Sequence, residues 1–124
     1  MTTIRHADMA VRMSDGPLDI RTANAGEMAV LHAAIPAGTD FAPVLNAIDP
    51  RGCMVPHWMY VVSGELRMVY PDGRVDSARE GEVLYAEPGH LPEIPVDTKF
   101  VEISPAKAAN ELMDKVMAIM AAQA

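Results

Sequence analysis

The residues of this chain best suited to chemistry are a thiol and an imidazole placed close together. Cys53 precedes His57 by four residues, and residues an even number apart along an extended strand share one face. Their side chains are expected to point the same way, provided that Gly52 and Pro56 introduce no bulge. Thiolate and imidazole are donors suited to Zn²⁺, Cu or Fe, so this pair is a candidate part of a metal site.

Among the acidic residues, Glu102 is the candidate for an interior role. It alternates with Val101 and Ile103 along a predicted strand, and an inward-facing carboxylate beside His57 would serve as a general base or as a partner that orients the imidazole. Other chemistry has little support. The sequence contains no Gly-x-Ser-x-Gly nucleophile motif and no glycine-rich phosphate loop, which argues against hydrolases and nucleotide-binding proteins.

Charge and length narrow the function classes further. Seventeen acidic and ten basic residues give a net charge of −7 over 124 residues, which disfavours nucleic acid and anionic membrane surfaces as partners. No apolar run approaches the roughly 20 residues of a membrane span. Cys53 is the only cysteine, which excludes an intrachain disulfide and fits a reducing compartment, so a cytoplasmic protein is predicted. The length predicts a single domain over residues 1–124.

The elements that must position these residues are predicted to be strands. Turn signals such as Pro71-Asp72-Gly73 and Glu80-Gly81 recur at short intervals, a spacing typical of an all-β sandwich or barrel. The Pro-Asp-Gly turn predicts a hairpin, because proline presets one turn dihedral and glycine accepts positive φ. Segments of strand length lie between the turns, at residues 18–22, 28–35, 55–62, 66–70, 74–78, 83–86 and 99–103.

The pattern changes near the C-terminus. Apolar residues recur every three or four positions after Ser104, which predicts an amphipathic α-helix over about residues 105–122, with Ser104 as its N-cap and Pro105 at its first position. The barrel is expected over about residues 8–103. Residues 39–52 suggest no regular structure and are interpreted as a loop that covers the barrel mouth.

Two segments resemble the signature segments of small cupins. They are Val55–Leu66, with Tyr60-Val61-Val62-Ser63-Gly64 at the turn, and Gly81–His90, with Glu87-Pro88-Gly89. The resemblance implies a cupin-type barrel, that is a double-stranded β-helix or jelly roll. The usual cupin ligands, three histidines and one glutamate, are not all present: His57 stands where the glutamate belongs, Arg51 and Cys53 stand where the paired histidines belong, and His90 lies two residues before the expected third histidine.

This resemblance implies a cluster of Cys53, His57 and His90 inside the barrel, which would bind a divalent metal (Zn, Fe, Cu or Mn) in an oxygenase or isomerase that acts on a small organic molecule. A pocket would be formed by Met59, Met68, Trp58, Tyr60 and Glu102. The alternative is a metal-free barrel that binds or senses a small ligand without catalysis. In the blandest interpretation, the histidines only hydrogen-bond to neighbours, and Cys53 is a small buried hydrophobe. Resemblance also suggests a homodimer.

Overall fold

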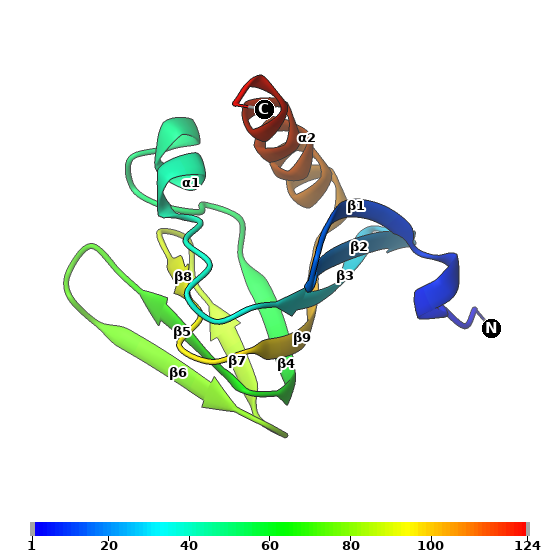
Figure 1. The fold of residues 1–124 in the computed structure, drawn as a ribbon, viewed down its shortest axis with the longest axis horizontal. Helices are drawn as coiled ribbons and strands as arrows, with labels where there is room; N and C mark the ends of the chain where they lie inside the picture. The colour runs from blue at the N-terminus through cyan, green and yellow to red at the C-terminus, as the bar shows by residue number, and fades with distance from the viewer. Residues whose placement is uncertain (1, 124) are drawn as a thin grey trace.

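The computed structural model, which describes residues 2–123, contains two facing sheets (Figure 1). Buried and exposed residues alternate along their strands. The larger sheet has the strand order β1-β2-β3-β9-β4-β7, and the smaller has the order β6-β5-β8, with every pairing antiparallel. The elements, in chain order, are the 3₁₀ turn η1 (His6–Asp8), β1 (Ala10–Asp15), β2 (Leu18–Ala25), β3 (Met28–Ile35), α1 (Ala42–Ile48), β4 (His57–Ser63), β5 (Glu65–Val69), β6 (Val75–Arg79), β7 (Val83–Ala86), β8 (Leu91–Glu93), β9 (Thr98–Pro105) and α2 (Ala106–Ala122).

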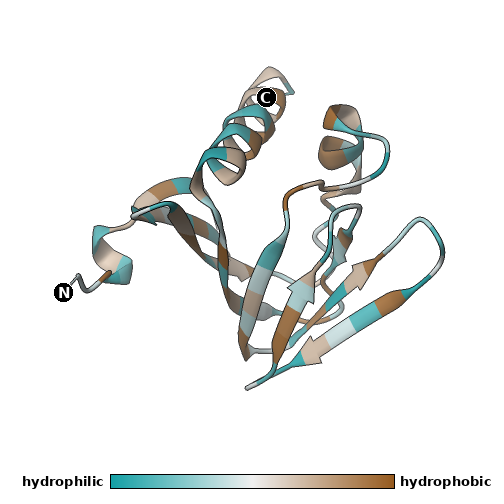
Figure 2. Cartoon of the chain, turned by 180° about the vertical axis from the view of Figure 1, so that it is seen from behind, coloured by the Kyte–Doolittle hydropathy of each residue, from teal (hydrophilic) through white to brown (hydrophobic). Residues whose placement is uncertain are grey.

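The hydrophobic core lies between the two sheets. Buried residues from the larger sheet, such as Ala33 and Phe100, pack with Leu66 and Met68 from the smaller one. Figure 2 shows the corresponding alternation of hydrophobic and hydrophilic residues along the strands. This arrangement is the all-β barrel with a C-terminal helix that the sequence predicted.

Strand β4 shows which of its residues face the interior. His57, Met59 and Val61 are buried, whereas Trp58 and Tyr60 are 56 % and 48 % exposed. The expectation that Trp58 and Tyr60 belong to the pocket is therefore corrected. Side chains in a strand alternate between faces, and these two have the opposite parity to His57.

The hairpin predicted at Pro71-Asp72-Gly73 is confirmed and joins β5 to β6. The backbone N–H of Tyr70 donates to the carbonyl of Arg74 at 3.0 Å, and the N–H of Gly73 donates to the carbonyl of Tyr70 at 2.9 Å. Gly73 has a φ of +90°, a conformation that residues with a side chain rarely adopt.

The C-terminal helix is confirmed as α2, but its predicted cap is wrong. Pro105 occupies the N-cap position, and Ser104 is the penultimate residue of β9. Strand β9 continues this far because it pairs with β3 up to Met28 and Pro105, and the N–H of Ala106 then donates to the Glu27 carbonyl at 2.8 Å. Ser104 is thereby held in the sheet and is free for a different contact.

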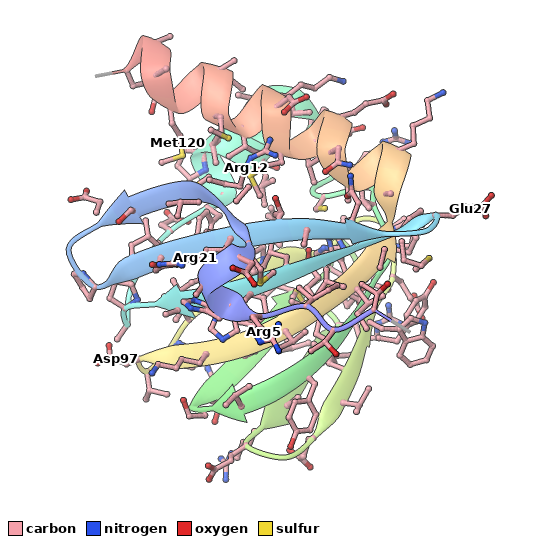
Figure 3. All side chains as sticks on the ribbon, turned by 90° about the vertical axis from the view of Figure 1, so that its right-hand side faces the viewer. Arg5, Arg12, Arg21, Glu27, Asp97 and Met120 are labelled. Atoms are coloured by element: carbon pink, nitrogen blue, oxygen red, sulfur yellow. The ribbon has the colours of Figure 1, made fainter. Side chains whose placement is uncertain are left out.

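Residues 39–52 contain a short helix, α1, where the sequence suggested only a loop. Val44 and Leu45 of α1 are buried in a second apolar cluster that includes Val116 of α2. The two helices lie side by side over one end of the sheets (Figure 1). Arg12 of β1 also contacts α2 through Asp114 at 2.7 Å (Figure 3). No helix within residues 2–123 is long and apolar enough to cross a membrane.

Candidate metal centre

The backbone brings Cys53 against His90, although they are far apart in sequence. The N–H of Cys53 donates to the His90 carbonyl at 2.8 Å, and the N–H of Gly89 donates to the Cys53 carbonyl at 2.7 Å. Gly52 makes this approach possible, because a Cβ at its φ of +103° would lie 2.8 Å from the His90 carbonyl oxygen. A side chain at position 52 would therefore push the two segments apart.

Strand β4 places His57 beside this pair. Sγ of Cys53 lies 3.4 Å from Nε2 of His57, and the rings of His57 and His90 meet edge to face with centroids 4.9 Å apart. One donor atom from each of the three residues lies within 4.8 Å of the other two. All three residues are buried, with exposures of 4 %, 5 % and 2 % in chain order. The structure therefore brings together the three residues that the sequence named as candidate ligands.

Hydrogen bonds orient both imidazoles. Nδ1 of His90 lies 2.6 Å from the Glu87 carbonyl oxygen, and since a carbonyl only accepts, Nδ1 carries the proton and Nε2 keeps its lone pair. Nδ1 of His57 lies 2.6 Å from Oγ of Ser104 and 3.4 Å from Oε2 of Glu102, which leaves Nε2 of His57 for the Cys53 side. An imidazole held by an oxygen partner at one nitrogen and free at the other is the usual state of a metal-binding histidine.

Burial sets the protonation of the histidines. Desolvation lowers the pKa of His57 to about 4, and it also lowers the pKa of His90 to about 4, against a weaker opposing effect of the Glu87 hydrogen bond. Both imidazoles are thus neutral near pH 7, which is the form that binds a metal ion.

Burial acts in the opposite direction on the two acidic groups. Desolvation raises the pKa of the Cys53 thiol to about 12 and that of Glu102 to about 7. Without a metal ion Cys53 is therefore a thiol, and a bound cation would have to displace its proton. Glu102, with 13 % of its side chain exposed, is placed to hold or release a proton near neutral pH beside His57.

The donor cluster opens into a cavity of about 120 Å³ inside the barrel. Met59, Met68 and Glu102, which the sequence placed in the pocket, line this cavity, whereas Trp58 and Tyr60 do not. Sequence reasoning missed Ser104 and the contributions of the helices, namely Leu45 from α1 and Leu112, Met113 and Val116 from α2. Parity would have found Ser104, since it shares a strand face with Glu102 once β9 is extended past Ile103.

Comparison with known proteins assigns the fold. No family model matches the sequence, and no curated protein matches it either. Solved structures do match. An RmlC-like cupin from Shewanella frigidimarina is 17% identical with a TM-score of 0.56, and the match covers 84% of this chain and 90% of that one.

Two further similar structures carry metal or enzyme names. FeII HppE is 10% identical with a TM-score of 0.56, over 84% of this chain and 60% of that chain. Oxalate decarboxylase from Bacillus subtilis is 16% identical with a TM-score of 0.53, over 85% of this chain and 30% of that chain. These identities are low, and what they share with this chain is the barrel. The protein has the cupin fold.

Proposed function

We propose that the protein binds one divalent metal ion through Sγ of Cys53 and Nε2 of His57 and His90, and acts as a metal-dependent enzyme on a small organic molecule. The observation that carries this proposal is the hydrogen bonding of the two histidines. Each has its Nδ1 beside an oxygen partner, Ser104 for His57 and Glu87 for His90, which leaves Nε2 of each ring available to a metal ion. Nε2 of His57 faces Sγ of Cys53 at 3.4 Å, so these two donor atoms point toward one place.

The donor set favours particular metals. One thiolate and two imidazoles suit Zn²⁺ or Fe²⁺ better than Mn²⁺, which prefers carboxylate and water ligands. The cupin fold of FeII HppE supports iron. Glu102 is not assigned as a ligand, because its closest approach is to Nδ1 of His57, on the side of the ring away from Cys53.

The chemistry follows from what each residue is placed to do. Three protein ligands leave a coordination position for substrate or water, where a metal ion supplies Lewis acidity. Glu102, with its pKa raised to about 7, serves as the proton acceptor or donor beside His57. Proton movement next to a polarised substrate suits an isomerase, and Fe²⁺ would instead suit an oxygenase. The similarity to oxalate decarboxylase supports an enzyme.

Elemental analysis of protein purified without a metal-affinity tag tests the proposal. We expect close to one Zn or Fe per chain, and loss of the metal in His57→Ala, His90→Ala and Cys53→Ser. His6→Ala is the matched control, because the His6 side chain is 46% exposed and contacts Asp19 rather than the three candidate ligands. In protein loaded with Co²⁺, a thiolate-to-metal absorption band should be present and should disappear in Cys53→Ser. Protein that binds none of Zn²⁺, Fe²⁺, Co²⁺, Cu²⁺ and Mn²⁺ would exclude a metal enzyme.

A metal-free barrel that binds a small ligand is the second candidate. It is favoured by the apolar lining, which includes Met59 and Met68, and by the protonated state of the buried Cys53 thiol. It predicts ligand binding that is the same with and without added metal. Metal in stoichiometric amount would contradict it.

We also propose that the protein is a cytoplasmic homodimer. A free thiol at Cys53 suits a reducing compartment. The face of the larger sheet that points away from the core carries an outer apolar patch, made of Trp58, Tyr60, Val62, Val83, Tyr85 and Ile103, each at least 40% exposed. None of these residues is charged, so two copies of a chain with a net charge of −7 can meet there without placing like charges together.

A further inference from the structure

We propose that the cavity beside Cys53 takes an uncharged, ring-sized organic molecule with one polar group, which points at the Cys53–His57–His90 corner. This inference deepens the proposed function, because it concerns the same cavity. It depends on the lining of the cavity, however, and can be tested without metal.

Polarity in the cavity is confined almost entirely to one corner. Cys53, His57, His90, Glu102 and Ser104 are contiguous, as their mutual contacts show. The rest of the lining is apolar except for Thr22 and Asn110, which are uncharged. The amide of Asn110 already donates to Asn24 at 3.1 Å. A ligand therefore finds most of its hydrogen-bond partners at the metal corner, and the apolar remainder of the lining disfavours a second polar group on it.

Charge disfavours an anionic ligand in the metal-free cavity. No lysine or arginine among residues 2–123 lines the cavity. Arg12, on neighbouring β1, is engaged outside it by Asp114 at 2.7 Å and by Sδ of Met117 at 3.2 Å (Figure 3). Without a metal ion, a carboxylate or phosphate ligand would be buried in the cavity with no cationic side chain as counter-ion, at a large desolvation cost.

Size limits the ligand to roughly one ring. The cavity holds about 120 Å³, and an engineered apolar cavity of about 150 Å³ in another protein binds benzene. Met13, Met59, Met68 and Met113 line the space together with Phe100. Methionine side chains adapt their shape and make favourable contacts with aromatic rings. Several of the chain's many methionines thus lie where their side chains would enclose a ring.

A set of one-ring compounds tests the charge and the polarity of the ligand. Phenol, benzoate and benzylamine are titrated into metal-free protein by calorimetry. Phenol is expected to bind at least about tenfold more tightly than either charged compound. Benzoate or benzylamine binding as tightly as phenol would overturn the proposal, as would no binding of phenol.

Two alanines of α2 locate the binding. Ala109 lines the cavity, and the exposed Ala118 does not. Both lie within the helix, where leucine is well tolerated. Ala109→Leu should weaken phenol binding at least about tenfold by filling the space, and Ala118→Leu should leave it unchanged. Equal phenol affinity in the two variants would place the ligand elsewhere and overturn the proposal.

A charge variant reverses the selectivity. Met113→Lys adds a cation to the lining, whereas Met120→Lys adds the same charge at a 38% exposed position of α2 outside the cavity. Benzoate binding should increase only in Met113→Lys. Metal analysis of the same samples separates the two proposals: protein that takes up no metal but prefers phenol overturns the metal centre alone, and protein that takes up metal but prefers benzoate once the metal is removed overturns only this ligand assignment.

Discussion

At the scale of single residues, the site depends on oxygen atoms that hold the two histidines in place. Ser104 lies 2.6 Å from Nδ1 of His57, and Glu87 supplies a backbone carbonyl at the same distance from Nδ1 of His90. The Ser104 hydroxyl is the one of these two partners that a substitution can remove. It is a positioning residue, since it acts through His57.

Ser104→Ala should therefore weaken metal binding while leaving the three ligands intact. Removing such a partner of a metal-bound histidine typically costs about 10- to 100-fold in affinity. Competition with a chromophoric chelator measures the Zn²⁺ dissociation constant. Ser104→Thr, which keeps the hydroxyl, should restore affinity, and Ser77→Ala on the exposed surface of β6 should have no effect. Unchanged affinity in Ser104→Ala would remove this role from Ser104.

The buried acidic and basic groups give metal-free protein a defined pH dependence. The pKa values of His57 and His90 fall from the ordinary value of 6.5 to about 4 on folding. Between pH 4 and 6.5 the unfolded state therefore binds more protons than the folded state, and stability is lost as pH falls through this range. The pKa of Glu102 rises from 4.5 to about 7, so the folded state binds the proton and this carboxyl lowers stability as pH rises from 4.5 to 7.

Glu102→Gln should separate these effects. The variant lacks the unfavourable ionisation of a buried carboxyl. Its free energy of unfolding should therefore increase relative to that of wild type as pH rises from 4.5 to 7, by up to a few kcal/mol. Above pH 7 the difference should stay constant. Urea unfolding of metal-free protein across this range gives the difference. A difference that does not vary with pH would show that Glu102 titrates normally.

At the scale of elements, the strands were predictable and the ends of the elements were not. The alternation in β4 and the glycine turns fix the sheets, because they depend on residue types within a short window. Ser104 was misassigned as a helix cap, since Ser-Pro before an apolar repeat is a strong cap signal. Only the pairing of Pro105 with Met28 reveals that the strand continues.

Local sequence patterns could not predict helix α1 or the proximity of the three ligands. Helix α1 spans only seven residues, and its burial depends on contacts with α2 rather than on a repeat of its own. The proximity of Cys53 to His57 followed from parity, but the position of His90 depends on the bridge between Cys53 and His90. That bridge joins distant segments, and the resemblance to cupins was needed to suggest it.

Gly52 provides a test of this bridge. Gly52→Ala and Gly73→Ala both place an alanine at positive φ, which costs about 1–2 kcal/mol, but only at Gly52 would the new Cβ meet a neighbour, the His90 carbonyl oxygen at 2.8 Å. We expect Gly52→Ala to be the less stable variant by a further ~1–3 kcal/mol. It should also lose metal affinity, which Gly73→Ala should keep. Equal stability of the two variants in urea would mean that the bridge tolerates a Cβ.

At the scale of the whole molecule, the cavity and the outer apolar patch lie on opposite faces of the same strands. Both helices cover the end of the barrel that holds the cavity. The outer apolar patch lies on β4, β7 and β9, on the opposite face of the strands that carry His57 and Glu102. A dimer formed through the patch would therefore leave the cavity lining untouched.

Trp58 reports directly on such a dimer, because it is the only tryptophan and lies 4.7 Å from the Tyr85 ring within the patch. It is 56% exposed in the single chain, so its fluorescence should shift to longer wavelength on dilution as the patch becomes solvated. Analytical ultracentrifugation over the same concentrations should give a change from dimer to monomer. Val83→Lys on neighbouring β7 should be monomeric at all concentrations, with its metal content and cavity binding unchanged, since Val83 is exposed and does not line the cavity. A monomer at high concentration, or a dimer that persists in Val83→Lys, would place the contact elsewhere or remove it.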